Sequence, residues 1–190
     1  MKTLLSMDTI INQIKQFADQ SHGDQMRKYS AEKYIVHPIR VMEICKEYDD
    51  SLPVLAAALL HDVLEDTNIT EQEMLSFLLS VMDPKDADET LQLVKELTDV
   101  YVKSAYPQWN RIQRKQKERE RIADTSAKSH TIKYADIIDN TREITVKDPA
   151  FAPRYLKECF DILMVADKGN DALYKIARQE VRKGLSNFRK

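Results

Sequence analysis

The residues best suited to chemistry are His61 and Asp62, which are adjacent at the polar end of the apolar segment LPVLAAALLHDVLEDT. Neighbouring positions on a helix differ by about 100° in direction, so an imidazole and a carboxylate there can converge on one ion. A divalent metal is the simplest occupant of such a site. Because an isolated His-Asp dipeptide is weak evidence, the metal interpretation depends on ligands elsewhere in the chain.

Two further residues can complete a metal site. His37 directly precedes Pro38, which favours an extended backbone at a helix entrance. Asp136 lies in the apolar stretch IKYADIIDN, where an unpaired carboxylate would be costly to bury. Individually, an ordinary partly buried loop histidine and a solvent-facing or salt-bridged helical aspartate are the favoured explanations. Together with His61 and Asp62 they form a His₂Asp₂ set, which suits Mn²⁺, Fe²⁺ or Zn²⁺ better than Mg²⁺.

The elements that must position these residues are helices. Only 3 Gly and 6 Pro interrupt a sequence rich in helix formers, which predicts an all-α fold. The DPKDAD stretch is expected to be a polar linker between two helices. Apolar residues at helical spacing, together with N-cap residues and prolines, predict helices over about 9–22, 38–48, 52–67, 71–82, 89–99, 126–146, 154–166 and 170–187. Asp8 is the expected N-cap of the first, and Thr70 with Glu73 forms a capping-box pattern before the fourth. The Ala/Leu run of the third is apolar nearly all round and is expected to be central.

Composition narrows the class of protein. The 190 residues suit one compact core, so a single domain over 1–190 is expected. A formal net charge of -2 offers no global field for nucleic acid or an anionic membrane, and neither partner is expected. Cys45 and Cys159 lie in helical patterns and are interpreted as packed thiols of a reducing compartment. No long apolar segment or signal-peptide pattern is present, which predicts a cytoplasmic protein.

Several segments, in order, resemble one family. The four candidate ligands follow the H…HD…D order of the HD phosphohydrolase superfamily. Five segments resemble the hydrolase domain of the RelA/SpoT family and of small stand-alone alarmone hydrolases. They are RKYSAEKYIVHPIRV, AALLHDVLEDT, ELTD, NRIQRK and IKYADIIDN. The resemblance spans about residues 20–145, with helices at about 154–187 expected to pack on that core. It implies an HD-domain helical bundle and a metal-dependent enzyme that removes the 3′-pyrophosphate from (p)ppGpp, usually with Mn²⁺.

The same resemblance identifies Glu65 and Asp66 as the catalytic carboxylates. They follow His61 and Asp62 by four residues, which on a continuous helix places both carboxylates one turn beyond the ligands. There they can orient or deprotonate the attacking water. The alternative is an acidic helix end without a function, although carboxylates are less favourable at a helix C-terminus than at an N-terminus.

Substrate binding is implied for Arg27, Lys28, Lys133 and Asn140. Lys133 and Asn140 lie at i−3 and i+4 from Asp136, on one helical face. A cation and an amide suit contacts to phosphate and to ribose or base. Tyr34 is open between a stacking role near the site and packing in the core.

The sequence leaves the substrate open. Ile137, Asp139 and Glu143 depart from the family's usual text around Asp136, which puts base recognition in doubt. A second hypothesis is therefore a phosphohydrolase acting on another nucleotide or phosphorylated metabolite. A third is a catalytically quiet metal or nucleotide sensor, which the complete set of ligands and carboxylates disfavours.

Two surfaces also have more than one interpretation. The basic cluster at 111–121 fits a solvated helix face as well as partial phosphate binding by Arg111, Arg114 or Lys115. The apolar helical faces after residue 150 can complete the core or associate with a second copy, so a homo-oligomer is left open.

Overall fold

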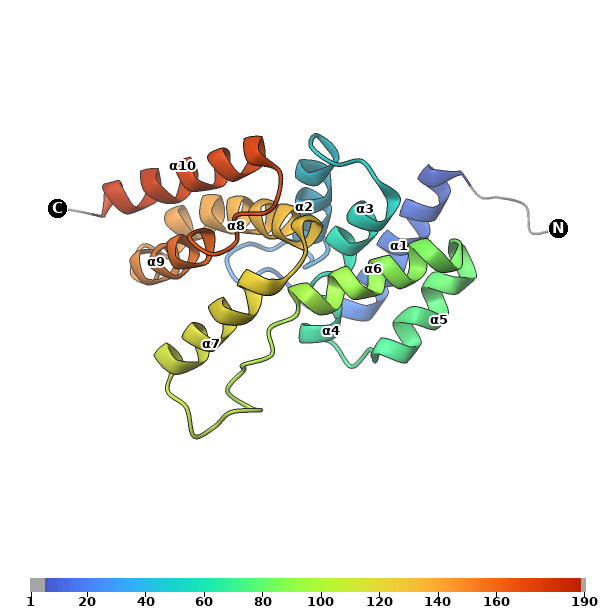
Figure 1. Cartoon of the computed structure of the whole chain (residues 1–190), viewed down its shortest axis with the longest axis horizontal. Coiled ribbons are helices and arrows are strands. Elements are labelled where there is room, and N and C mark those ends of the chain that lie inside the picture. Colours follow the sequence, from blue (N-terminus) through green and yellow to red (C-terminus); the bar gives the residue numbers. More distant parts are fainter. Residues whose placement is uncertain (1–5, 189–190) are drawn as a thin grey trace. The chain divides into compact units, whose positions relative to one another are not determined.

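The computed structural model describes residues 6–188 and is helical throughout that range, apart from loops and one isolated antiparallel bridge between Met26 and Lys33 (Figure 1). The all-α prediction is confirmed. The helices divide into two compact units that meet in the sequence between Thr98 and Asp99. The expectation of a single domain over 1–190 stays a prediction.

The first unit is organised around α3. Its helices are α1 (Met7–His22), α2 (Val36–Lys46), α3 (Leu52–Leu60), α4 (Val63–Asp66), α5 (Glu71–Val81) and α6 (Pro84–Leu97). α3 packs against α1, α2 and α6 (Figure 1), and every residue from Pro53 to Leu60 is buried. A helix that is apolar all round is stable only inside a core, so the predicted central position of this segment is confirmed.

The helix predicted over 52–67 is interrupted at the His61-Asp62 pair. α3 ends at Leu60 and α4 begins at Val63, and Asp62 between them adopts φ −96° and ψ −7°, close to the bridge region at the edge of the helical region. The prediction of one continuous helix was therefore wrong. The N–H of Asp66 still donates to the carbonyl oxygen of Asp62 at 2.8 Å, so the four-residue relation between these two acids survives the break.

Capping side chains explain where two other helices begin. Thr70 accepts from the N–H of Glu73, whose carboxylate accepts from the N–H of Thr70, and this confirms the predicted capping box of α5. Ser6 caps α1 by accepting from the N–H of Thr9. The expected N-cap, Asp8, instead lies in the first turn, where its charge is favourable.

The DPKDAD stretch is not the expected linker. Asp83 accepts from the N–H groups of Lys85 and Asp86 at 3.0 and 3.2 Å and is the N-cap of α6, with Pro84 as its first residue. An aspartate followed by proline is a strong helix start, and this start outweighed the polar composition.

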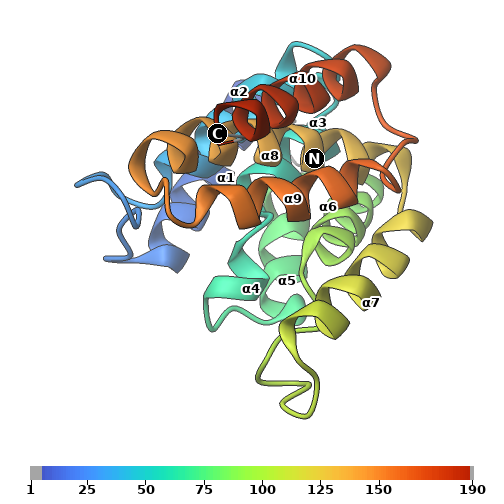
Figure 2. The same ribbon diagram turned by 90° about the vertical axis from the view of Figure 1, so that its left-hand side faces the viewer.

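The second unit contains α7 (Arg111–Asp124), α8 (Ala127–Lys147), α9 (Ala152–Leu163) and α10 (Asp171–Asn187). α8, α9 and α10 pack on one another, and α7 packs on α9 (Figure 2). The buried residues of α9 and α10 recur every three or four positions, as in any amphipathic helix. They are Ala152, Leu156, Cys159, Leu163, Leu173, Ala177, Val181 and Gly184.

Gly184 permits the close packing of α10 against α9. A Cβ atom at this position would lie 2.9 Å from a δ-carbon of Leu156, closer than side-chain atoms approach one another. Both cysteines are buried thiols, as predicted: Cys45 in the first unit and Cys159 in the second. Among the described residues, none of the helices combines the length and the apolar character needed to cross a membrane.

Candidate metal centre

Three of the four predicted ligands converge in the first unit. Nitrogen atoms of His37 and His61 and a carboxylate oxygen of Asp62 all lie within 4.8 Å of one another. The Nε2 atoms of His61 and His37 are 3.0 and 3.7 Å from Oδ2 of Asp62. Both histidines are buried, at 3% and 1% exposure, whereas the Asp62 side chain is 20% exposed. The cluster therefore combines a buried wall of imidazoles with one carboxylate reached by solvent.

The backbone orients the His61 ring. Its Nδ1 lies 2.8 Å from the carbonyl oxygen of Ala58, and since a carbonyl only accepts, Nδ1 carries the proton. Nε2 then presents its lone pair toward Asp62, as in metal-binding histidines whose second nitrogen donates to the protein. Two imidazole nitrogens and a carboxylate oxygen form a donor set that fits a divalent transition metal.

Tyr34 lies against this cluster. Its hydroxyl donates to Oδ2 of Asp62 at 2.6 Å. One neighbour of its ring is His22, with ring centroids 4.5 Å apart, and the Arg27 guanidinium lies 5.6 Å from the ring centroid. Of the two interpretations left open for Tyr34, packing at the candidate site therefore describes it better than packing in a remote core.

Glu65 and Asp66 lie outside the three-residue cluster, and both are exposed on the short helix α4. Oδ2 of Asp66 accepts from Nε2 of Gln25 at 3.1 Å, and Oε1 of Gln25 lies 2.9 Å from Nδ1 of His22. No motif in the sequence pointed to His22 and Gln25. Their only signal is a histidine before glycine at a helix end, which indicates termination of the helix as readily as a function.

The two basic residues proposed for substrate binding have different surroundings. Arg27 is 9% exposed, and its N–H donates to the carbonyl oxygen of Glu32 at 2.9 Å. Lys28 is exposed and donates to the hydroxyl of Tyr29 at 2.8 Å. Arg27 is thus part of the packed loop before α2, whereas Lys28 extends from it.

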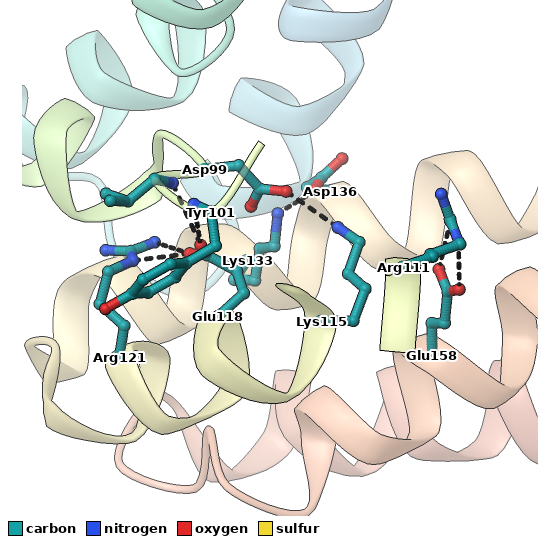
Figure 3. Close-up of polar contacts among 10 residues, drawn as sticks. Asp99, Tyr101, Arg111, Lys115, Glu118, Arg121, Lys133, Asp136 and Glu158 are labelled. Carbon is teal, nitrogen blue, oxygen red and sulfur yellow. Dashed lines mark hydrogen bonds and ion pairs between the residues drawn. The ribbon is translucent and has the colours of Figure 1, made fainter. Parts of the chain in front are cut away.

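Asp136, the fourth predicted ligand, lies on α8 in the second unit and is 8% exposed. Its Oδ2 accepts from Nζ of Lys133 at 3.0 Å (Figure 3), and its Oδ1 accepts from Nδ2 of Asn140 at 2.6 Å. The three side chains share a helical face, as their spacing predicted. The role of Asp136 as a ligand stays a prediction, as do the substrate contacts of Lys133 and Asn140.

Asp99, at the end of the ELTD segment, joins this polar region (Figure 3). It accepts from Nζ of Lys115 at 2.9 Å. Burial acts to raise the pKa of the Asp99 carboxyl, but the positive charges of Lys115, Lys133 and Arg121 outweigh it and hold that pKa below its ordinary value. Asp99 is therefore an anion between lysines of α7 and α8.

The basic cluster of α7 is engaged in contacts within the second unit. Arg111 forms a two-pronged ion pair with Glu158, at 2.7 and 2.6 Å, and Arg114 donates to the carbonyl oxygen of Trp109. Glu118 is 3% exposed, whereas the basic side chains of this helix are exposed or half-buried. To bind phosphate, Arg111, Arg114 or Lys115 would have to give up its present contact within the protein. Phosphate binding by these residues stays a prediction.

Comparisons with known proteins agree with this helical site. The model of the HD domain family matches residues 15–165, so the chain belongs to the HD domain family, as its sequence predicted. The guanosine-3′,5′-bis(diphosphate) 3′-pyrophosphohydrolase MESH1 of Drosophila melanogaster is 34% identical over 140 residues, which are 70% of this chain and 69% of that protein. A solved structure, described as a metazoan ortholog of SpoT that hydrolyzes ppGpp, has a TM-score of 0.76 and 26% identity. The match covers 96% of this chain and 99% of the chain in the solved structure.

Longer relatives match over a smaller part. The guanosine-3′,5′-bis(diphosphate) 3′-pyrophosphohydrolase of Aquifex aeolicus is 42% identical over 64 residues, which are 34% of this chain and 9% of that protein. The chain spans about a tenth of the length of this relative and of two similar long relatives.

Proposed function

We propose that this protein is a metal-dependent phosphohydrolase that removes the 3′-pyrophosphate from (p)ppGpp. The observation that carries the proposal is the convergence of His37, His61 and Asp62 within 4.8 Å. The choice of substrate rests on the Drosophila relative named for this reaction and on the solved relative described as hydrolysing ppGpp.

His37, His61, Asp62 and Asp136 would hold the metal, and Mn²⁺ is the proposed ion, with Fe²⁺ and Zn²⁺ as alternatives of similar ligand preference. Asp136 is included because it completes the H…HD…D order of the family. When bound, the metal supplies positive charge that polarises the attacked phosphate and acidifies a water molecule. Tyr34, by donating to Asp62 at 2.6 Å, fixes the orientation of that carboxylate.

Glu65 and Asp66 are the proposed proton-handling groups. One carboxylate would orient the attacking water and accept its proton, and an acid would return a proton to the ribose 3′-oxygen as pyrophosphate leaves. Both carboxylates are exposed, so water can reach them. Because Glu65 and Asp66 lie outside the cluster of buried histidines, different side chains would transfer protons and bind the metal.

Arg27, Lys28, Lys133 and Asn140 are the proposed substrate contacts. The three cations would offset the charge of the pyrophosphate and the 5′-phosphates, and the Asn140 amide would reach ribose or base. A nucleotide substrate and buried cysteine thiols suit a cytoplasmic location. Self-association through the apolar faces of the last helices remains a proposal of the same kind.

The test is Mn²⁺-dependent release of pyrophosphate from ppGpp by metal-stripped and reconstituted protein, measured beside Asp62→Ala and Glu65→Ala. Asp88→Ala is the matched control, because Asp88 is an exposed acid of the same unit. We expect each site variant to lose more than about 100-fold in kcat, beyond the usual effect of an outer-shell substitution, and the control to match the wild type.

Three results would contradict parts of this proposal. Release from other nucleotides or phosphorylated metabolites but not from ppGpp would change the substrate. Metal binding without turnover of any of them would make the protein a sensor. Full activity of Asp62→Ala would remove the metal centre from the mechanism.

A further inference from the structure

A hydrogen-bonded network lies behind the acidic residues of the first unit and begins at the end of α1. His22 is 6% exposed. Its Nδ1 is 2.9 Å from Oε1 of Gln25, and Nε2 of Gln25 is 3.1 Å from Oδ2 of Asp66. Two side chains outside every predicted site thus connect α1 to one of the two proposed catalytic carboxylates.

The chemistry of these groups gives the network a direction. The Asp66 carboxylate only accepts, so the NH₂ group of Gln25 must face it. The Gln25 carbonyl oxygen then faces His22, which must carry its proton on Nδ1 to donate. Nε2 of His22 is buried with no hydrogen-bond partner among the described residues, so a second N–H there would be an unsatisfied donor. The ring is therefore held as the Nδ1–H tautomer.

A second branch runs from His22 to the metal cluster. The His22 ring packs on Tyr34, with centroids 4.5 Å apart and planes inclined by 36°. The Tyr34 hydroxyl donates to Asp62 at 2.6 Å. His22 thus contacts both side chains that donate to the two carboxylates, Gln25 for Asp66 and Tyr34 for Asp62.

The backbone fixes the position of this network. Gly23 ends α1 with φ +56°, a conformation that favours glycine. The N–H of Gln25 donates to the carbonyl oxygen of His22 at 3.0 Å, and the N–H of Tyr34 donates to the carbonyl oxygen of Gln25 at 2.9 Å. Backbone hydrogen bonds therefore hold His22, Gln25 and Tyr34 at fixed positions relative to one another.

We propose that His22 and Gln25 are positioning residues for the acidic groups of the site. His22 orients the Gln25 amide so that it holds one oxygen of Asp66, and it supports the Tyr34 ring that holds Asp62. This inference rests on the proposed function, in which Asp66 handles a proton. A neutral amide suits the task, because it fixes an exposed carboxylate without neutralising the charge that a base needs.

The first test replaces Gln25 by a residue of the same shape. Gln25→Glu keeps an acceptor for His22 but presents a carboxylate, instead of a donor, to Asp66. We expect kcat for Mn²⁺-dependent ppGpp hydrolysis to fall about 10- to 100-fold, as for outer-shell residues of metal sites, with KM changed by less than about threefold. Gln16→Glu adds the same charge at an exposed position of α1 and should leave both constants unchanged.

The second test separates the hydrogen bond of His22 from its packing. His22→Phe keeps an aromatic ring but removes the donor, and His22→Asn can restore a donor N–H near the position of Nδ1. We expect His22→Phe to lower kcat about 10-fold and His22→Asn, which restores the donor but lacks the ring beside Tyr34, to recover part of that loss. Thermal unfolding of each variant identifies any loss of fold. Equal kcat in the wild type, Gln25→Glu and His22→Phe would overturn the inference.

A third measurement does not depend on turnover. The chain has four histidines, so the ring nitrogens of ¹⁵N-histidine-labelled protein can be assigned by substitution. We expect His22 to be the Nδ1–H tautomer with a slowly exchanging proton, and Gln25→Ala to make that exchange faster. The Nε2–H tautomer would overturn the inference whatever the activity. A wild type that shows the expected tautomer but does not hydrolyse ppGpp would instead overturn the proposed function, and the positioning role in catalysis with it.

Discussion

Glu118 and Asp136 are buried acids on consecutive helices of the second unit, with 3% and 8% exposure, and they are satisfied in different ways. Oε2 of Glu118 accepts from the backbone N–H groups of Val100 and Tyr101, both at 3.1 Å, and its other oxygen accepts from Arg121. Two side chains of its own helix, Lys133 and Asn140, donate to Asp136.

The source of the donors separates a residue that maintains the fold from one that is available for chemistry. Glu118 ties α7 to a loop 17 and 18 residues earlier in the chain, so losing it releases that loop. Lys133 and Asn140 bond to Asp136 along a helix that its own backbone already maintains, so these two hydrogen bonds fix the carboxylate without fixing the fold. Buried acids of the first kind should affect stability, and those of the second kind activity.

The largest expected effect is that of Asp136→Asn on activity. Removing a proposed metal ligand should lower Mn²⁺-dependent ppGpp hydrolysis by more than about 100-fold, beyond the loss at outer-shell positions. The free energy of unfolding should change less than in Glu118→Ala, because Asn has the shape of Asp and its amide oxygen can still accept from Lys133. Mn²⁺ titration calorimetry and urea unfolding of the metal-free protein measure the two. A large loss of stability with unchanged metal affinity would reverse the assignment.

The next effect is that of Glu118→Ala on stability. This change leaves two backbone donors and Arg121 without their carboxylate, and breaking a buried ion pair costs about 3 to 5 kcal/mol. Glu120→Ala is the control, since Glu120 is half-exposed and pairs with Lys117 on the same helix, where surface pairs contribute about 1 kcal/mol or less. Equal urea midpoints for the two variants would show that burial of Glu118 has no energetic consequence.

The same contrast explains how far the sequence could predict this molecule. Helical periodicity and the Thr70–Glu73 capping box predicted the all-α fold, and the His-Asp pair with the preceding histidine predicted the cluster that converges within 4.8 Å. These are local patterns, in which the residues that matter lie within a few positions of one another or belong to a known motif order.

What the sequence did not predict depends on contacts between distant segments. Glu118 reads as one of several charges on a polar helix, and no pattern around it signals its hydrogen bonds to the loop at residues 100–101. Gln25 meets Asp66 across 41 positions, and neither residue has a neighbour that signals the contact. The break at His61-Asp62 is also invisible to periodicity, because helix formers surround it on both sides.

A smaller effect is expected at Asn140, one of the two donors to Asp136. Asn140→Ala should lower Mn²⁺ affinity about 10-fold, the lower end of the range for outer-shell residues, because Oδ1 of Asp136 loses its 2.6 Å donor. Calorimetry in the absence of nucleotide measures this directly. If Asn140 acts only on the substrate, metal affinity will stay at the wild-type value while KM rises, and the orienting role of this donor will be wrong.

The smallest expected effect is on the pH dependence of stability and comes from Cys159. Its thiol shows a third way of burying an ionisable group, which is to keep the group neutral. Burial raises the pKa of its thiol from 9.0 to about 12. The unfolded thiol loses its proton near pH 9 while the folded one retains it, so the unfolded state binds fewer protons and stability falls as pH rises from about 9 to about 12. Between pH 7.5 and 9.5 the wild type should therefore lose about 1 kcal/mol more than Cys159→Ala. Urea unfolding of both proteins at the two pH values measures that difference. Parallel pH dependence would mean that the native thiol ionises as readily as the unfolded one, and that burial does not keep it neutral here.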